Sequence, residues 1–486
     1  MRLSELLREV EFEGSIKTDF DIKLVTDDSR LVRPGALFVC IRHRSFDGHT
    51  AAAEALASGA AAVVTQERLG LENELNVVDS RAAYARLCAA RCGHPERKLR
   101  MIGVTGTNGK TTVTTLIRNI LSDSGIKTLL TGTVCNRLGE ESLPSGLTTP
   151  KPPELYSLLS RAVLSGCEAC VAEASSQALA QGRLEGIAFD AAVFTNITRD
   201  HLDYHGTFEN YLAAKKKLFE HSEVSAVNLD DPRADEIIAA SSGKTVTFST
   251  VLDCADYTAK NISLLPEGVS FELVSKGRIE HINFASPGLF SVSNAMAAAV
   301  CAINLGVDPR SAAQSLARSK GVCGRLERVE CGTPYSVIID YAHTPDGLEQ
   351  VLRALRPSCR GKLIVLFGCG GDRDKTKRPL MGAAACKYAD TVIVTSDNPR
   401  SEEPMKIIGD ILKGTDKKRR GLFIEEDRRR ATALALSLAK PGDTVLLAGK
   451  GHEKYQLICG EKLPLDERET VREILGLPHD TGRKKP

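Results

Sequence analysis

A glycine-rich loop with a lysine and two threonines is the part of this sequence whose residue types most clearly suggest chemistry. The loop follows the apolar run 101–104 and reads Gly106-Thr107-Asn108-Gly109-Lys110-Thr111-Thr112. Apolar residues recur behind it at helical spacing, at Val113, Leu116, Ile117, Ile120 and Leu121. A strand, such a loop and a helix can surround phosphate oxygens with backbone N–H groups. Lys110 could then reach the β- and γ-phosphates of ATP, and the Thr111 hydroxyl could bind Mg²⁺.

This loop departs from the common phosphate-loop pattern, because Val104 stands where that pattern has its first glycine. A glycine-rich turn can also do no more than begin a helix. The strand before the loop, the helix after it and the Gly-Lys-Thr-Thr run favour phosphate binding over that structural role.

A carboxylate and an imidazole follow two further predicted strands. Glu173 lies near the end of the strand-like run 169–174, and His201 lies in the loop after the run 189–194. Because the carboxyl ends of parallel strands meet at one edge of a sheet, we expect both side chains near the phosphate loop. With Thr111 they could form a Mg²⁺ site. Imidazole is an uncommon Mg²⁺ ligand, so these residues alone leave His201 equally well explained as a hydrogen-bonding group.

The elements that must position these groups alternate between strand and helix, which predicts α/β domains with parallel sheets. The length of 486 residues suggests three domains, which we place at 1–95, 96–323 and 324–486. In the third, the apolar runs 363–367, 392–394 and 444–448 each lead into a polar loop. Three such loops at strand ends of one sheet predict a binding site.

Composition excludes several functional classes. Lys+Arg number 64 and Asp+Glu 62, a formal net charge of +2, which gives no overall attraction to nucleic acid or to an anionic membrane. No apolar stretch reaches the length of about 18 residues that could span a bilayer. Fourteen cysteines without an export signal indicate reduced thiols in the cytoplasm. We expect a cytoplasmic protein and a monomer, although the sequence does not determine the oligomeric state.

Several motifs, in chain order, resemble the Mur ligase family and the related folylpolyglutamate synthetases, which are ATP-dependent amide-forming ligases. They are GTNGKTT at 106–112, TNITRDHLDYHG at 195–206, GRLE at 324–327 and DYAHTPD at 340–346. The resemblance implies an α/β fold of three domains, with a central P-loop-type parallel-sheet ATPase domain and a Rossmann-like C-terminal domain.

The same resemblance implies roles for residues around ATP. His201 becomes a metal ligand with Thr111 and Glu173. Lys215, which by composition alone belongs to a solvated basic helix face, becomes a carbamylated lysine that binds a second Mg²⁺. The implied catalytic residues are Lys110, His201, Lys215 and Arg325, and the implied nucleotide contacts beyond the loop are Asn294, Arg325, Asp340 and His343. Asn294 lies in a segment that resembles a helix start of the family, and it could also simply cap that helix.

The loops GCGGDRD, DNPR and GKGHE resemble the branch of the family that adds the third amino acid to a UDP-linked muramoyl dipeptide, and DNPR its diaminopimelate-adding form. Diaminopimelate differs from lysine by a second carboxylate, which an arginine fork binds in bidentate fashion. Arg400 is therefore the predicted selector. The implied diaminopimelate contacts are Arg373, Asp397, Asn398, Pro399, Arg400, Gly449 and Glu453.

The first domain resembles the part of that branch that holds the UDP-sugar. The implied contacts are Asp27, Ser29, Arg44, Ser45, Phe46, Thr148, Thr149, Ser175, Gln181 and Arg183. Two residues depart from the family pattern: His43 replaces a glycine, and Cys323 replaces a proline before Gly-Arg.

The expected reaction joins meso-2,6-diaminopimelate to UDP-N-acetylmuramoyl-L-alanyl-D-glutamate through an acyl phosphate, with ATP and Mg²⁺, in peptidoglycan synthesis. One alternative is the same ligation with L-lysine or another amino acid. Two others are a P-loop kinase or motor ATPase and a non-catalytic UDP-sugar-binding protein. The DNPR and GKGHE loops disfavour the first of these two, and intact Lys110, Glu173, His201 and Lys215 disfavour the second.

Overall fold

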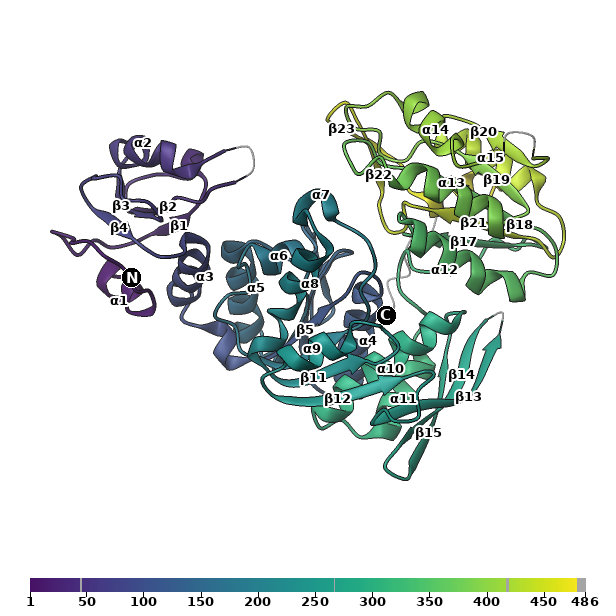
Figure 1. The fold of residues 1–486 in the computed structure, drawn as a ribbon, viewed down its shortest axis with the longest axis horizontal. Coiled ribbons are helices and arrows are strands. Elements are labelled where there is room, and N and C mark those ends of the chain that lie inside the picture. Colours follow the sequence, from purple (N-terminus) through teal and green to yellow (C-terminus); the bar gives the residue numbers. More distant parts are fainter. Residues whose placement is uncertain (44–45, 266, 417–418, 479–486) are drawn as a thin grey trace.

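The computed structural model describes residues 1–43, 46–265, 267–416 and 419–478. It contains three α/β bodies in chain order, drawn from purple through teal to yellow in Figure 1. Among the described residues, no helix is long and apolar enough to cross a membrane. The predicted α/β fold with parallel sheets in several domains is confirmed.

The N-terminal body is built on a four-stranded parallel sheet in the order β1-β2-β3-β4. Its strands and helices are β1 (Leu24–Thr26), β2 (Ala36–Val39), β3 (Ala60–Thr65), β4 (Glu74–Asn76), α1 (Leu3–Leu6), α2 (Ala52–Ala57) and α3 (Ser80–Arg91). β2 and β3 are buried along their whole length, as expected for strands covered on both faces.

The central body holds an eleven-stranded sheet in the order β15-β14-β13-β12-β11-β10-β5-β9-β6-β7-β8. The strands from β6 to β13 in this order are parallel, and antiparallel strands extend both ends. The strands are β5 (Arg100–Thr105), β6 (Thr128–Thr131), β7 (Asn136–Leu138), β8 (Glu141–Leu143), β9 (Ala169–Glu173), β10 (Phe189–Phe194), β11 (Ser222–Asn228), β12 (Lys244–Ser249), β13 (Tyr257–Leu265), β14 (Gly268–Ser275) and β15 (Arg278–Phe284).

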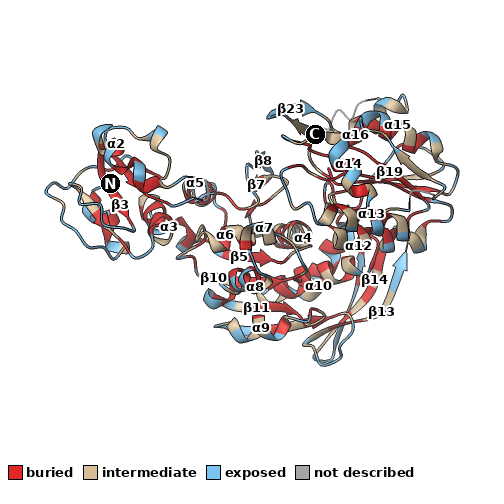
Figure 2. Cartoon of the chain, turned by 45° about the horizontal axis from the view of Figure 1, so that its top comes forward, coloured by how far each residue is buried: buried red, intermediate tan, exposed pale blue. Residues whose placement is uncertain are grey.

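Helices cover both faces of this central sheet. One face packs on α4 (Lys110–Asp123), α10 (Leu289–Asn304) and α11 (Pro309–Arg318). The other carries α5 (Pro152–Leu164), α6 (Ser176–Ala180), α8 (Phe208–Lys216) and α9 (Ala234–Ala240), and the short α7 (Leu202–His205) lies beside α8. Figure 2 shows the resulting buried layer inside the central body, with exposed residues at the projecting end of β13.

The C-terminal body has a six-stranded sheet in the order β16-β17-β21-β18-β19-β20, parallel except for β16. Its strands are β16 (Glu327–Val329), β17 (Ser336–Asp340), β18 (Leu363–Phe367), β19 (Thr391–Val394), β20 (Leu422–Ile424) and β21 (Thr444–Ala448), with a separate hairpin of β22 (Tyr455–Ile458) and β23 (Glu461–Pro464). Its helices are α12 (Pro345–Leu355), α13 (Lys377–Tyr388), α14 (Pro404–Leu412), α15 (Arg428–Leu438) and α16 (Glu467–Ile474).

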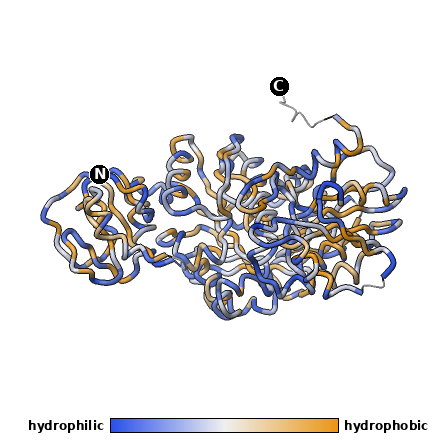
Figure 3. Tube along the Cα trace, turned by 90° about the horizontal axis from the view of Figure 1, so that it is seen from above, coloured by the Kyte–Doolittle hydropathy of each residue, from blue (hydrophilic) through white to orange (hydrophobic). Residues whose placement is uncertain are grey.

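The first two bodies share apolar packing. α3, the last helix of the N-terminal body, packs on α5 of the central body, and one buried apolar cluster includes Tyr84 and Leu87 from α3 and Leu155 and Leu159 from α5. In Figure 3 the hydrophobic segments gather inside each body and the hydrophilic ones lie at the outer loops. The limits 1–95, 96–323 and 324–486 remain predictions.

Candidate functional site

The glycine-rich loop joins β5 to α4, as the sequence predicts, and its glycines are required by close packing. Gly109 has φ 88° and precedes the first residue of α4. A Cβ atom there would lie 2.5 Å from Asn294 Oδ1, and one on Gly106 would lie 1.9 Å from Thr195 Oγ1. Any side chain at either position would have to displace the side chain of Asn294, on α10, or of Thr195, directly after β10. The loop is therefore held close to both elements, with the N-terminus of α4 behind it.

Lys110 folds back over this loop. Its Nζ donates to the carbonyl oxygens of Gly106 at 2.8 Å and Thr107 at 2.9 Å. Burial lowers the pKa of Lys110, and the charges of Glu173 and Asp200 partly oppose that effect. The ammonium is thus fixed at the mouth of the loop where phosphate oxygens of a nucleotide would lie.

Glu173 lies at the end of β9 and is 1% exposed. Its Oε2 accepts from the hydroxyls of Thr111 at 3.0 Å and Thr133 at 2.9 Å, and its Oε1 accepts from the Thr133 N–H at 2.8 Å. Arg325 Nη2 donates to the same Thr111 hydroxyl at 3.1 Å. The phosphate loop, the central sheet and the start of the C-terminal body therefore meet at Thr111. Thr133 was not predicted, because it belongs to no motif and reaches the site only through the fold.

His201 lies between β10 and α7 with φ 53°. Its Nε2 is 3.5 Å from Asp200 Oδ2. Burial lowers the pKa of His201 despite the attraction of Asp200, so the imidazole is neutral near pH 7. Neutral imidazole is the form that can bind a metal.

Lys215 is 1% exposed on α8, so the predicted alternative of a solvated helix face is wrong for this residue. Its Nζ lies 4.6 Å from the centroid of the Tyr211 ring. Burial and the nearby charge of Lys110 lower the pKa of Lys215 well below its ordinary value. A buried amine with a lowered pKa is more often neutral, and the neutral amine is the form that can combine with CO₂.

These groups line one cavity of about 310 Å³ between the central and C-terminal bodies. The predicted residues that line it are Gly106, Thr107, Asn108, Gly109, Lys110, Thr111, Thr112, Thr148, Thr149, Glu173, Ser175, Arg183, His201, Lys215, Asn294, Arg325, Asp340 and His343. Asp200, Thr133 and Tyr341 also line it and were not predicted.

The donor set in this cavity fits Mg²⁺ only if Lys215 carries a carbamate. Among the described residues, no three His, Cys, Asp or Glu side chains are grouped so as to hold a metal ion. The Thr111 hydroxyl, the Glu173 carboxylate and the His201 imidazole provide a partial set, and a carbamate on Lys215 would add an anionic oxygen ligand of the kind that Mg²⁺ prefers. The residues fit the ion if Lys215 is modified.

The C-terminal side of the cavity is organised by Asp340. Its carboxylate accepts from the Leu326 N–H and the Ala342 N–H, both at 2.7 Å, and burial raises its pKa. These bonds hold the segment that carries Arg325, whose guanidinium carbon lies 4.7 Å from the Tyr341 ring centroid. His343 donates from Nδ1 to the Tyr341 carbonyl at 2.8 Å, and burial lowers the pKa of His343 to about 4.

The predicted start of the helix that carries Asn294 is wrong. α10 begins at Leu289 after Gly288, so Asn294 lies within the helix and is not its cap. Four helical residues, 289–292, precede Ser293, and the first two of them are the apolar Leu289 and Phe290. Asn294 nevertheless faces the phosphate loop, because its Oδ1 lies 2.5 Å from the position that a Cβ on Gly109 would occupy.

The predicted amino-acid loops follow β18, β19 and β21, which are neighbouring parallel strands. Arg400, with φ 54°, donates from Nη1 to the Gly371 carbonyl at 2.6 Å. Gly370 lies beside both Arg400 and Arg373, and Gly371 packs directly against the Pro399 carbonyl. The glycines let the first two loops approach each other closely, which brings the two predicted carboxylate-binding arginines to one place.

Glu453 is one of the two acidic residues among the predicted diaminopimelate contacts. Its Oε2 accepts from Asn398 Nδ2 at 2.9 Å, and the Tyr341 hydroxyl lies 3.5 Å from its Oε1. Gly449 has φ 109° and donates its N–H to the Asp340 carbonyl at 2.9 Å. Tyr341 also lines the 310 Å³ cavity, so the amino-acid loops adjoin that cavity at this side chain.

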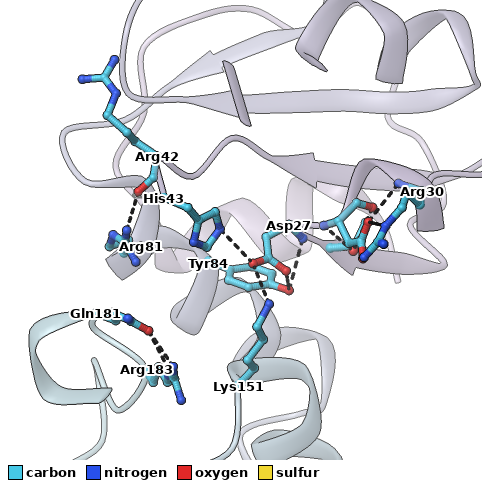
Figure 4. Close-up of polar contacts among 11 residues, drawn as sticks. Asp27, Arg30, Arg42, His43, Arg81, Tyr84, Lys151, Gln181 and Arg183 are labelled. Carbon is cyan, nitrogen blue, oxygen red and sulfur yellow. Dashed lines mark hydrogen bonds and ion pairs between the residues drawn. The ribbon is translucent and has the colours of Figure 1, made fainter. Parts of the chain in front are cut away.

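The predicted UDP-sugar residues occupy both sides of the junction between the first two bodies (Figure 4). Asp27 accepts from the Tyr84 hydroxyl at 3.1 Å, and its Oδ2 lies 3.3 Å from Lys151 Nζ and 3.6 Å from His43 Nε2. Burial lowers the pKa of His43, and Asp27 partly opposes that effect. Figure 4 places Arg81 on the same side as His43.

Across the junction, Arg183 donates to the Thr149 carbonyl at 2.7 Å and to Gln181 Oε1 at 2.7 Å. Thr149 Oγ1 is 3.1 Å from Ser175 Oγ. Ser29 begins a short 3₁₀ turn after β1, and Phe46 is 47% exposed. Arg44 and Ser45 lie outside the described residues. The residues Tyr84, Arg81 and Lys151 were not predicted, although the position of Lys151 directly after Thr148-Thr149-Pro150 could have suggested it.

Comparisons with known proteins agree with this architecture. Three family descriptions match the chain: Mur ligase family, catalytic domain at residues 21–95, Mur ligase middle domain at 104–302, and Mur ligase, glutamate ligase domain at 324–451. Relatives named UDP-N-acetylmuramoyl-L-alanyl-D-glutamate--2,6-diaminopimelate ligase include one from Syntrophomonas wolfei, 43% identical over 98% of this chain and 99% of the relative. Another, from Caldanaerobacter subterraneus, is 44% identical with the same two coverages.

Solved structures give the same result. A structure titled as a UDP-N-acetylmuramoyl-L-alanyl-D-glutamate--2,6-diaminopimelate ligase is 35% identical, with a TM-score of 0.71 over 98% of this chain and 99% of that one. MurF from Acinetobacter baumannii, at 21% identity, a TM-score of 0.63 and 97% of each chain, shares the fold. With relatives above 40% identity along almost the whole sequence, the chain belongs to the Mur ligase family.

Proposed function

We propose that this chain is an ATP-dependent ligase that joins meso-2,6-diaminopimelate to UDP-N-acetylmuramoyl-L-alanyl-D-glutamate in peptidoglycan synthesis. The observation that carries the proposal is the position of Tyr341. It lines the phosphate-loop cavity, and its hydroxyl lies 3.5 Å from Oε1 of Glu453, whose loop adjoins the one that holds Arg400. A nucleotide site and an amino-acid site therefore adjoin each other, as an amide ligase requires.

The first step is a phosphoryl transfer. The side-chain carboxylate of the D-glutamate attacks the γ-phosphorus of ATP, the new O–P bond forms, and the bond to the bridging oxygen breaks to release ADP. Lys110 and Arg325 lie where they can stabilise the negative charge of the transferred group, since both point into the same cavity. Asn294, Asp340 and His343 line the part of the cavity proposed for the nucleoside.

The second step forms the amide. The amine of diaminopimelate attacks the acyl carbonyl carbon, the C–N bond forms, and the C–O bond to phosphate breaks as inorganic phosphate leaves. Glu453 and the DNPR loop hold the amino acid, and Arg400 with Arg373 binds the carboxylate that lysine lacks. A lysine in this site would leave the arginine fork unpaired.

Mg²⁺ is proposed to be held by Thr111, Glu173, His201 and carbamylated Lys215. When bound, it would neutralise charge on the phosphate oxygens. The lowered pKa of Lys215 supports the modification, because CO₂ reacts with the neutral amine.

The nucleotide-linked substrate is proposed to lie across the junction of the first two bodies. Arg183 with Gln181 and the hydroxyls of Thr148, Thr149 and Ser175 would face its sugar and diphosphate, and Asp27, Ser29, Arg44, Ser45 and Phe46 its uridine. The lining of the cavity by Thr148, Thr149, Ser175 and Arg183 supports this placement, since it puts the far end of the substrate beside ATP. We further propose that the chain acts as a cytoplasmic monomer.

The test is phosphate release by the purified chain with ATP, Mg²⁺ and the dipeptide precursor, given diaminopimelate or L-lysine in turn. We expect turnover with diaminopimelate and little with lysine. Faster turnover with lysine would support the alternative substrate, and release with neither would argue for the non-catalytic alternative. Light scattering of the same sample measures the oligomeric state.

A further inference from the structure

Lys450 is a buried cation that none of the steps above uses. It follows β21 between Gly449 and Gly451 and is 0% exposed. Its Nζ donates to Glu453 Oε2 at 2.6 Å and to Asn398 Oδ1 at 2.9 Å, and lies 3.7 Å from Asp397 Oδ1. An ammonium is kept in such a place only where anions and acceptors offset the loss of its hydration. Here the acceptors come from two different loops.

Those two loops are the ones that follow β19 and β21. The Asn398 side chain, from the first, makes three hydrogen bonds within the protein: its Oδ1 accepts from Lys450 and from the Leu457 N–H at 2.8 Å, and its Nδ2 donates to Glu453 Oε2. Lys450 donates to both Asn398 and Glu453, which also bond to each other, so the three side chains form one unit.

The two oxygens of Glu453 have different surroundings. Oε2 receives both Lys450 and Asn398, whereas Oε1 has the Tyr341 hydroxyl at the longer distance of 3.5 Å. Oε1 is thus the oxygen available to an incoming ammonium.

We propose that Lys450 is a positioning residue for the amino-acid substrate, which fixes the Glu453 carboxylate so that Oε1 faces the amino group. This inference rests on the proposed function, since it assigns Glu453 to the amine of that substrate. Lys450 acts through Glu453 and does not touch the substrate.

The experiment compares Lys450→Met with the unchanged chain by separate KM values for diaminopimelate, ATP and the nucleotide-linked precursor. We expect the KM for diaminopimelate to rise at least tenfold and the other two to stay within twofold. In a Glu453→Gln background, Lys450→Met should add less than twofold. Arg118→Met is the matched control, because it removes another buried cation, one that pairs with Glu140 in the central body. It should leave the KM for diaminopimelate unchanged.

An unchanged KM for diaminopimelate, an equal rise in all three KM values, or full independence of the Lys450 and Glu453 effects would overturn the proposal. If Lys450→Met does not fold, Lys450→Arg keeps the charge but moves the donors, and it must still raise the KM for diaminopimelate selectively. If the chain uses lysine in place of diaminopimelate, the proposed substrate is wrong. The proposal for Lys450 then requires that Lys450→Met raise the KM for lysine selectively. Inactivity with both amino acids overturns both proposals.

Discussion

The carboxylate of Asp346, in the first turn of α12, accepts a hydrogen bond at 2.9 Å from the side-chain amide of Asn108 in the phosphate loop. The same Oδ2 accepts from the Thr198 hydroxyl at 3.3 Å. The C-terminal body therefore contacts the phosphate loop and the loop that carries His201 through one carboxylate. This contact lies at the edge of the cavity proposed for ATP.

We predict that Asp346→Ala raises the KM for ATP about tenfold, because two hydrogen bonds between the bodies are lost and each contributes about 0.5–1.5 kcal/mol. Steady-state kinetics with varied ATP measures the effect. Glu349→Ala is the control on the same helix, where the carboxylate accepts from Tyr388 at a distance from the loop. Equal KM values for the two variants would contradict a role of Asp346 in holding the bodies around ATP.

Lys215→Ala should abolish turnover, and short carboxylates such as formate should restore part of it by replacing the carbamate oxygens. The activity of the unchanged chain should rise with added bicarbonate. Because the carbamate needs the neutral amine, and burial already lowers the pKa of Lys215, activity should fall as acidification protonates the amine. Phosphate release with and without bicarbonate measures both effects. Lys216→Ala, at the less buried neighbouring position, should behave as the unchanged chain, and full activity of Lys215→Ala without rescue would remove the proposed role.

Arg400→Met should lower kcat/KM for diaminopimelate by about a hundredfold or more, a loss of about 2.7 kcal/mol in transition-state stabilisation. The reason is that a bidentate arginine–carboxylate contact is lost and the distal carboxylate is left unpaired. The relative activity with lysine should rise, because the repulsion between the guanidinium and the lysine ammonium disappears. Competition between the two amino acids, followed by mass spectrometry of the products, gives the ratio directly. An unchanged ratio would exclude Arg400 as the selector.

The positions of the loops of this site could be predicted from the sequence, but the hydrogen bonds that their side chains make within the protein could not. Strand, glycine-rich loop and helix are local features, so the positions of Lys110 and Thr111 follow from spacing alone. Asn398 and Asp340 were predicted as ligand contacts, yet hydrogen bonds within the protein occupy both side chains. A polar side chain bonds to whichever groups the fold brings next to it, and many of these come from distant segments of the chain. The spacing of residues within a motif does not show which groups those are.

The start of α10 is a second feature that the local sequence did not predict correctly. Ser293-Asn294 is a favourable capping pair by residue type. In the structure the helix continues past it towards the N-terminus, because buried packing of α10 on α4 and the central sheet outweighs the local preference. The fold class could be predicted from the alternation of strands and helices. The contacts of Thr133 with Glu173 could not, because forty residues separate them in the chain.

The buried ion pair of Arg428 and Glu467 gives a prediction about stability. Both side chains are 1% exposed, and Arg428 also donates to the carbonyls of Ser396 and Ala448 at the ends of β19 and β21. Burial raises the pKa of Glu467, so its carboxylate depends on Arg428 to remain charged. Arg428→Met would leave that carboxyl group buried without its partner. We expect the free energy of unfolding of the C-terminal body to fall by about 3–5 kcal/mol.

Adding Glu467→Leu to Arg428→Met should restore most of that loss, because an apolar pair no longer leaves a buried charge uncompensated. Hydrogen exchange of peptides from β19 and β21 in increasing urea reports on this body alone, which avoids treating a multi-domain chain as two-state. The neighbouring Arg429–Glu473 pair is the matched control, because Arg429 is 57% exposed, and Arg429→Met should change stability by less than about 1 kcal/mol. If Arg428→Met were as mild as Arg429→Met, the buried pair would not be what holds the two strand ends beneath the amino-acid loops.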